Sequence, residues 1–414
     1  IGTYLPGLTV PSYAKLIFIP DSFFVESSST VLLANAGFEN LRNDMMRKSM
    51  GKLLSIETAL KSKNINVDVF ERQLVEAIER KSDMTDNNGI VKKVDENAKV
   101  SIKGILPCPV RMQFIESFEK FVESRDYKIN YNLNAASMGM DAIESEIMNA
   151  KTEDDLSDIY MSAGFNLFFD NKYMGRFRDK GVFKDHRIGK LNKSLDNENI
   201  SLRDPKGEYS IIGVVPAIFI VNKDVLGDRS LPTSWEDLFK PEFENSIALP
   251  TSDLDMFNAI MLGIYSKYGR EAVEALGRGL LKSMHPAQMV KTGGRKDFNT
   301  PAVSIMPYFF SKTIKENSNL TVVWPKDGAI ISPVFLLTRK KNYDNSKPLI
   351  DFLLSKEVAD ILGADGKFPQ TNPEYDNKLA EDQNFLWAGW EFIHSNDIGE
   401  ILLNTEKWFY GQTE

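Results

Sequence analysis

SWEDLFKPEFENSIALP, residues 234–250, tells more about the fold than any other segment of this 414-residue chain. Ser234, with Asp237 three residues later, forms a capping-box pattern in which Asp replaces the usual Glu, and this pattern predicts the start of a short helix. Pro241 predicts the end of that helix, because proline cannot continue it. Residues 246–249 then predict a short buried strand that ends at a second proline.

The composition is that of a globular protein with two or three domains: 42% of the residues are hydrophobic and 26% are charged. A net charge of −8 argues against nucleic acid as a partner, because no excess of lysine and arginine is available to replace phosphate counterions. One cysteine excludes an internal disulfide, and three scattered histidines lack the spacing of a zinc site. We therefore expect no metal and no cofactor. No apolar run approaches the ~20 residues that cross a bilayer.

From residue 100 the pattern alternates between strands and helices. Strands are predicted at 102–106, 128–133 and 159–161, and helices at 110–122 and 140–149. This order predicts a parallel sheet with right-handed crossovers. Ligands bind at the carboxyl ends of such strands, so one rim should carry Pro107, Cys108, Pro109, Ala136, Ser137, Ser162, Ala163 and Gly164.

Two later apolar strands predict a second lobe. The strand at 211–221 contains Gly213 and Pro216, which mark a bend or an edge, and we expect it to cross from one lobe to the other. Residues 330–338 would return the chain to the first lobe. The predicted fold class is therefore α/β, with two lobes and a ligand cleft between them that closes by hinge motion.

The predicted domains are a small all-α domain at 28–82, a linker at 83–98, a first lobe at 99–212 and 328–414, and a second lobe at 213–327. The linker is polar and has almost no large apolar side chains. Residues 170–208, rich in Lys, Asp, Asn and Arg, predict an irregular surface excursion.

The 232–250 segment resembles a signature of the extracellular solute-binding proteins of ABC importers, in the branch that includes ferric-iron and polyamine receptors. The matching positions are Pro232, Trp235, Asp237, Leu238, Pro241, Phe243, Ile247, Ala248 and Pro250. Further points of resemblance lie at 213–216, 221–223, 304–308 and 324–329, so the resemblance covers most of 100–410. It implies a type II periplasmic-binding fold, a small-molecule or ion ligand, an ABC permease as partner, no catalysis, and an extracytoplasmic location.

The N-terminal unit is similar to a small helical domain of unknown function, through residues 36–41, Gly51 and 55–60. Many members of that family carry a CxxC pair after the Gly-Phe, and this chain has none there. We therefore carry over no redox role. An alternative reading keeps the fold but makes the chain a cytoplasmic ligand sensor that docks through this domain. Residues 1–24 contain no apolar run long enough for a signal-peptide core, which keeps that alternative open.

Cys108 is the most reactive-looking group, because it precedes a predicted helix N-terminus. An enzyme reading would make it a nucleophile, whereas packing between Pro107 and Pro109 is the simpler explanation. The amides that open the helix, together with Arg111, could meet an anionic part of a ligand.

Candidate ligand contacts come from both predicted lobes. Tyr308 is the sharpest indicator of ligand class, because ferric-binding members use two adjacent tyrosines whereas Phe309 follows here. One phenolate cannot replace two, so Tyr308 would contact an organic ligand instead. The full candidate set is Cys108, Pro109, Arg111, Ser137, Ser162, Gly164, Gln288, Lys291, Tyr308 and Asp327.

Overall fold

The computed structural model describes residues 90–107, 109–125, 128–135, 140–251, 253–292, 294, 299–315 and 318–412. The chain divides into two compact units, Ile1–Asn87 and Asn88–Glu414. The helical domain predicted at 28–82 lies outside the described residues, and so do 83–89 of the predicted linker. The fold below is that of the second unit.

The strands of this unit form one mixed sheet. Along its main path the order is β1-β3-β2-β4-β10-β5-β8-β6-β7, with β9 beside β5 and β11 beside β10. The strands are β1 Ile90–Lys93, β2 Val100–Leu106, β3 Ile129–Ala135, β4 Ile159–Ala163, β5 Tyr209–Asn222, β6 Ile247–Leu249, β7 Leu280–Ser283, β8 Val303–Pro307, β9 Leu320–Val323, β10 Ala329–Thr338 and β11 Phe385–Leu386. The parallel arrangement predicted for β2, β3 and β4 is confirmed.

The linker prediction is wrong for Ile90–Lys93, which forms the edge strand β1. This strand pairs antiparallel with β3, with Val91 opposite Leu133. Its sequence, IVKK, is too short and its flanks are too polar for periodicity to reveal it. The pairing comes from tertiary contact with β3, which the local sequence does not encode.

Two long strands, β5 and β10, lie in the middle of the sheet and connect two groups of strands. The first group is β1 to β4, and the second group is β6 to β9. The first part of β5 pairs with β10, and the part from Ala217 onward pairs with β8 and β9. The end of β10 pairs with β4, from Val334 to Thr338. Every residue of both strands is buried. The predicted crossing segments are therefore confirmed, and the two prolines, Pro216 and Pro333, lie where the strands pass between the groups.

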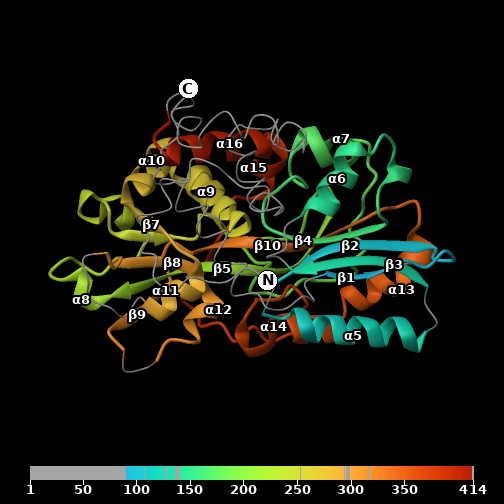
Figure 1. Ribbon diagram of the computed structural model, residues 1–414, viewed down its shortest axis with the longest axis horizontal. Helices are drawn as coiled ribbons and strands as arrows, with labels where there is room; N and C mark the ends of the chain where they lie inside the picture. The colour runs from blue at the N-terminus through green and yellow to red at the C-terminus, as the bar shows by residue number, and fades with distance from the viewer. Residues whose placement is uncertain are drawn as a thin grey trace, which may run out of the picture. The chain divides into compact units, whose positions relative to one another are not determined.

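Helices cover both faces of the sheet (Figure 1). One face carries α6 Asp141–Asn149, α7 Arg176–Arg178, α9 Leu254–Tyr268, α10 Arg270–Gly279, α15 Trp390–Ser395 and α16 Ile398–Phe409. The other carries α5 Arg111–Ser124, α11 Pro286–Thr292, α12 Tyr308–Ser311, α13 Tyr343–Leu353 and α14 Lys356–Gly363, while α8 Lys223–Leu226 follows β5. Among the residues with described structure, no helix is both long and apolar enough to span a membrane.

The 170–208 segment is not only a surface excursion, as its composition predicted. Its apolar side chains are buried, including Phe177, Phe183 and Leu195. The segment is anchored from the C-terminal region, where His394 Nε2 lies 2.7 Å from Oδ1 of Asp204. Some charged side chains are buried as well, including Arg178 and Asp204, so apolar residues and paired polar residues together fix the segment to the core.

The capping box predicted from the sequence is present. The Asp237 amide donates to Ser234 Oγ over 3.3 Å, and the Ser234 amide donates back to Asp237 Oδ2 over 3.1 Å. The helix that follows is a short 3-10 helix, Glu236–Phe239. Trp235 is fully buried, and its indole Nε1 donates to the Gly328 carbonyl over 2.9 Å. The signature segment therefore fixes the start of the returning strand β10.

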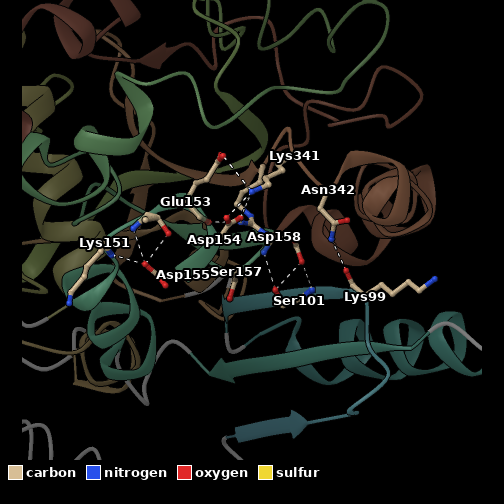
Figure 2. A network of polar contacts seen from close by, with 12 residues as sticks. Lys99, Ser101, Lys151, Glu153, Asp154, Asp155, Ser157, Asp158, Lys341 and Asn342 are labelled. Carbon is tan, nitrogen blue, oxygen red and sulfur yellow. Dashed lines mark hydrogen bonds and ion pairs between the residues drawn. The ribbon is translucent and has the colours of Figure 1, made fainter.

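A polar network ties β2, β4 and β10 together at their outer ends (Figure 2). Arg339, directly after β10, forms an ion pair with Asp158 over 2.5 Å, and both side chains are at most 10% exposed. The other oxygen of Asp158 accepts from the amide and hydroxyl of Ser101. Nearby, Lys341 pairs with Asp154 in solvent. This network lies at the amino ends of β2 and β4, so the carboxyl ends of these two strands are at the opposite edge.

Candidate ligand-binding site

The carboxyl ends of the three parallel strands form one edge, as predicted. Leu106 at the end of β2 pairs with Ala135 at the end of β3, and Gly104 pairs with Met161 of β4. Two of the predicted site residues, Cys108 and Ser137, belong to this edge by chain position but lie outside the described residues. Ser162 is buried in β4.

Gly164, directly after β4, is the point at which α9 contacts this edge. Its φ is +76°, and an added Cβ would lie 2.7 Å from Cα and Cβ of Asp255, in the first turn of α9. Only glycine allows both this left-handed backbone and this close approach. In the same turn, Asn258 Nδ2 donates to the Phe165 carbonyl over 2.8 Å. The start of α9 therefore closes directly over the end of β4.

Asp255 is a carboxylate in an unfavourable place for its charge. Burial raises its pKa to about 8, the negative charge of Asp253 adds to this rise, and a hydrogen bond from the Asn166 side chain opposes it. Asp253 itself caps α9, since its Oδ1 accepts from the Met256 amide. Part of the Asp255 side chain still meets solvent. A carboxyl with these properties favours a bound cation, which would restore its ionised form.

An aromatic cluster begins at Phe165, the residue directly after Gly164. Phe165 is buried and stacks on the partly exposed ring of Trp387, with centroids 5.5 Å apart. Trp387 in turn meets Trp390 edge to face at 5.7 Å. The indole N–H groups of both tryptophans are buried, and neither meets a hydrogen-bond acceptor in the described structure. Aromatic faces next to a carboxylate suit an organic cation.

Pro109 and Arg111 lie at the same edge, where β2 leads into α5. The helix begins at Arg111, so Pro109 belongs to the preceding turn and not to the first helical position. In that turn the Val110 amide donates to the Pro107 carbonyl over 3.2 Å. Arg111 is buried, at 8% exposed, which makes its guanidinium part of the packed edge.

Tyr308 begins α12, on the face of the sheet opposite to α9 (Figure 1). Lys312 Nζ donates to its hydroxyl over 2.8 Å and also lies over its ring. The Trp324 ring meets it edge to face at 5.1 Å. An ammonium group beside a phenol repels a metal cation, so the surroundings of Tyr308 disfavour a hard metal ion.

Asp327 links the signature segment to α9. Its Oδ2 accepts from the Trp235 amide over 2.9 Å and from the Tyr268 hydroxyl over 2.6 Å. Burial raises the pKa of the Tyr268 hydroxyl, and its hydrogen bond to Asp327 raises this pKa further. Asp327 also lines a polar crevice of about 270 Å³ with Asn199 and Asn384. Oδ2 of Asp327 therefore stabilises the fold, while Oδ1 is buried and has no hydrogen-bond partner among the described residues.

Gln288 and Lys291 lie on α11, and the side chain of Lys291 is outside the described residues. Gln288 is partly exposed. The structure therefore brings Gly164 to the contact with α9, keeps Ser162 buried in β4 two residues earlier, and leaves Gln288, Tyr308 and Asp327 on other elements.

Asp255, Asn166 and Asn258 were not among the residues predicted from the sequence. The segment 253–258, DLDMFN, carried a usable signal: two acids at a helix start, directly after a buried strand that ends at the sheet edge. A groove of about 620 Å³ lies between α5 and α13 and contains none of the predicted site residues. Its walls include Lys120 and Phe352.

Two groups of strands joined by β5 and β10, with a polar contact at the strand ends between them, define a two-lobed type II periplasmic-binding fold. Among the groups described, no three His, Cys, Asp or Glu side chains gather to hold a metal ion. The profile of the bacterial extracellular solute-binding protein family matches residues 154–396, more than half of the chain. The chain belongs to this family. A second profile, of a domain of unknown function (DUF1858), matches residues 28–70.

Curated relatives agree with this assignment. The spermidine/putrescine-binding periplasmic protein of Salmonella typhimurium is 26% identical over 325 residues, covering 70% of this chain and 86% of its own length. The protein of that name from Escherichia coli K12 is 25% identical over 321 residues, with the same coverage of both chains.

Solved structures share the fold at low identity. Apo ferric ion-binding protein A of Pasteurella haemolytica covers 76% of this chain and 99% of its own, at 15% identity and a TM-score of 0.54. The periplasmic binding protein AfuA of Actinobacillus pleuropneumoniae, solved with fructose-6-phosphate, covers 77% and 100% at 17% identity and a TM-score of 0.52. The chain is thus a solute-binding component of an ABC-type importer, which captures a small ligand and delivers it to an ABC permease.

Proposed function

We propose that the ligand is a small organic polycation of the polyamine class. The observation that carries the proposal is Asp255, a carboxyl whose pKa is raised to about 8 by burial at the contact with Gly164. Neutralising this group by an ammonium would be favourable, because the burial cost of the charge is then offset by a partner. The relatives named for spermidine and putrescine support the same ligand class.

Capture of iron fits the chain less well. Lys312 Nζ donates a hydrogen bond to the Tyr308 hydroxyl, so an ammonium group already occupies the position where a metal ion would bind. The structures of ferric-binding proteins resemble this chain at 15–17% identity, which speaks for the fold and not for the ligand.

Closure would follow from contacts made by both lobes. Gly164 and Asn166 belong to the proposed first lobe, 99–212 and 328–414, and Asp255 to the proposed second lobe, 213–327. A cation held at Asp255 against the end of β4 would favour the closed state by its differential affinity for that state. The permease would then recognise the closed receptor. We also propose that binding is non-catalytic and takes place in the periplasm or at the cell surface.

Isothermal titration calorimetry with spermidine, putrescine and ferric citrate tests the proposal. We expect saturable binding of at least one polyamine and none of ferric citrate, with a matching mass in native mass spectrometry that is lost on denaturation. Absence of polyamine binding, or a ferric complex, would overturn it. Cys108→Ala should retain ligand binding, whereas a cysteine-dependent enzyme would lose turnover.

A further inference from the structure

Residues 184–190, KDHRIGK, form a loop that presents an apolar side chain to solvent; we name it the Ile188 loop. Ile188 is 97% exposed, while the other large exposed hydrophobic residues described, such as Val94 and Leu231, lie between 42% and 69%. A single exposed apolar residue is common, but almost complete exposure on a well-fixed loop leaves its whole hydrocarbon surface in water.

The loop is held in place by its own polar contacts. At its start, the Lys184 amide donates to the Thr338 carbonyl over 3.0 Å. The Arg187 guanidinium pairs with Asp185 over 2.8 Å, and both side chains are buried. Beyond the tip, Arg203 donates to the carbonyl of Gly189. These contacts fix the loop on both sides of Ile188.

Exposed lysines lie at both ends of the loop and on the segments paired with it. Lys184 and Lys190 open and close the loop, and Lys340 lies beside it because its amide donates to the Val182 carbonyl over 2.9 Å. Lys184 and Lys340 both lower the pKa of His186, although burial is the larger cause. Lys206 is adjacent, since the Asp185 amide donates to the Gly207 carbonyl over 2.6 Å.

The acids near the tip do not cancel this charge. Asp185 lies within the loop and is neutralised by Arg187, and the exposed carboxyl of Asp179 lies farther back along the chain. A cluster of lysines is unusual on a chain whose net charge is −8. The local charge at this point is opposite in sign to that of the whole molecule, which orients the tip toward an anionic partner.

We propose that the Ile188 loop docks the protein on an anionic lipid surface, with Ile188 inserted at the interface and the lysines at the phosphate groups. A protein partner would need a broad complementary surface of roughly 1,000 Å² or more, whereas a single convex apolar tip ringed by long flexible cations suits the headgroup region of a bilayer. This docking is independent of the ligand bound in the cleft, and it would keep the receptor near its permease.

Co-sedimentation of the full chain with lipid vesicles tests this proposal. We expect binding to vesicles of phosphatidylglycerol and phosphatidylcholine at low salt, little binding to phosphatidylcholine alone, and weakening as salt rises. Ile188→Asp and the pair Lys184→Glu with Lys190→Glu should each weaken binding by about fivefold or more. Leu231→Asp and Lys315→Glu, elsewhere on the surface, are the matched controls and should bind as wild type.

A second readout uses Ile188→Trp. The difference between its emission and that of the wild type should shift to shorter wavelength when anionic vesicles are added. An unshifted spectrum, equal binding to both vesicle types, or equal losses in the controls would overturn the proposal. Binding to native membranes but not to lipid vesicles would assign the loop to a membrane protein instead, and would also overturn it.

Discussion

Asp255 lies directly against Gly164, so closely that the backbone of one leaves no room for a side chain on the other. The two residues come from distant parts of the chain, one following β4 and the other opening α9. Their contact holds the start of α9 against the carboxyl end of β4. The proposed ligand site depends on this contact.

Gly164→Ala should therefore damage both stability and binding. The new methyl would meet Asp255 at 2.7 Å, and the backbone would be strained at φ +76°. We expect a loss of about 2–4 kcal/mol in unfolding free energy and a large loss of ligand affinity. The control is Gly207→Ala, where φ is +64° but nothing lies within 4 Å. Denaturant unfolding of both variants separates crowding from backbone strain, and equal losses would contradict the close contact.

Asp255→Asn should stabilise the ligand-free protein while weakening binding. The folded pKa of Asp255, about 8, is above its unfolded value near 3.8, so the folded state holds the proton more tightly. The wild type then loses stability from this group as pH rises from about 4 to about 8, and the variant does not. We expect the variant to be more stable by about 1–3 kcal/mol at pH 8.5 and equal at pH 4.

The measurement is thermal unfolding across this pH range, with Asp228→Asn, an exposed carboxylate, as the control. Polyamine affinity of Asp255→Asn should fall by about tenfold or more, because a charged partner is lost. A variant that binds as wild type would remove Asp255 from the site.

Ligand binding should release protons below pH 8. Because Asp255 is largely protonated there in the ligand-free protein, an ammonium that requires its ionised form displaces that proton. Affinity should therefore rise with pH and level off above about 8. Calorimetry in two buffers of different ionisation enthalpy, at pH 6.5 and at pH 9, measures the released protons directly. No release at pH 6.5 would mean that Asp255 stays protonated in the complex.

Much of the fold could be predicted from the sequence because its central strands are continuous apolar runs with clear ends. β6, Ile247–Leu249, lies within the strand predicted at 246–249, and the Ser234 capping box is present as expected. Strands β1 and β7 could not be found, because four residues with mixed polarity pair only through tertiary contacts. The 170–208 segment was predicted as a surface excursion because most of its residues are polar or charged. The few residues that pack it against the core, such as Phe177 and Phe183, do not form a recognisable pattern.

The candidate site was predictable only in part. Strand order placed Ser162 and Gly164 at the edge formed by the carboxyl ends of the parallel strands, where the structure has them, because parallel strands end together. Asp255 was not predicted, since only the path of β5 and β10 brings α9 to β4. Asp327, predicted as a ligand contact because it is an acid at a crossing, uses Oδ2 to accept from Trp235 and Tyr268, while its buried Oδ1 has no partner among the described residues, so its ligand role stays a prediction.

Two tryptophans allow a test of the signature segment. The indole N–H of Trp235 donates to Gly328, whereas that of Trp387 is buried with no acceptor among the described residues. Trp235→Phe should cost about 1–3 kcal/mol, because it leaves a buried carbonyl unsatisfied. Trp387→Phe loses no hydrogen bond and should cost clearly less. Urea unfolding compares them, and a Trp387→Phe loss as large as that of Trp235→Phe would contradict the assignment.

The two ion pairs at the outer strand ends should differ sharply in strength (Figure 2). Arg339 and Asp158 are buried at 10% and 6% exposure, whereas Lys341 and Asp154 are more than half exposed. Arg339→Met leaves a buried carboxylate without its cation and should cost about 3–5 kcal/mol. Lys341→Met breaks a screened surface pair and should cost about 0–1 kcal/mol.

Raising the salt concentration provides the control for this comparison. Salt should weaken the Lys341 pair and leave the Arg339 pair nearly unchanged, because solvent ions cannot enter the buried site. Chemical denaturation in urea, which adds no ions, gives both unfolding free energies at low and high salt. If Arg339→Met cost no more than Lys341→Met, the network would not hold β2, β4 and β10 together, and the strand-end edge would owe its geometry to the apolar core alone.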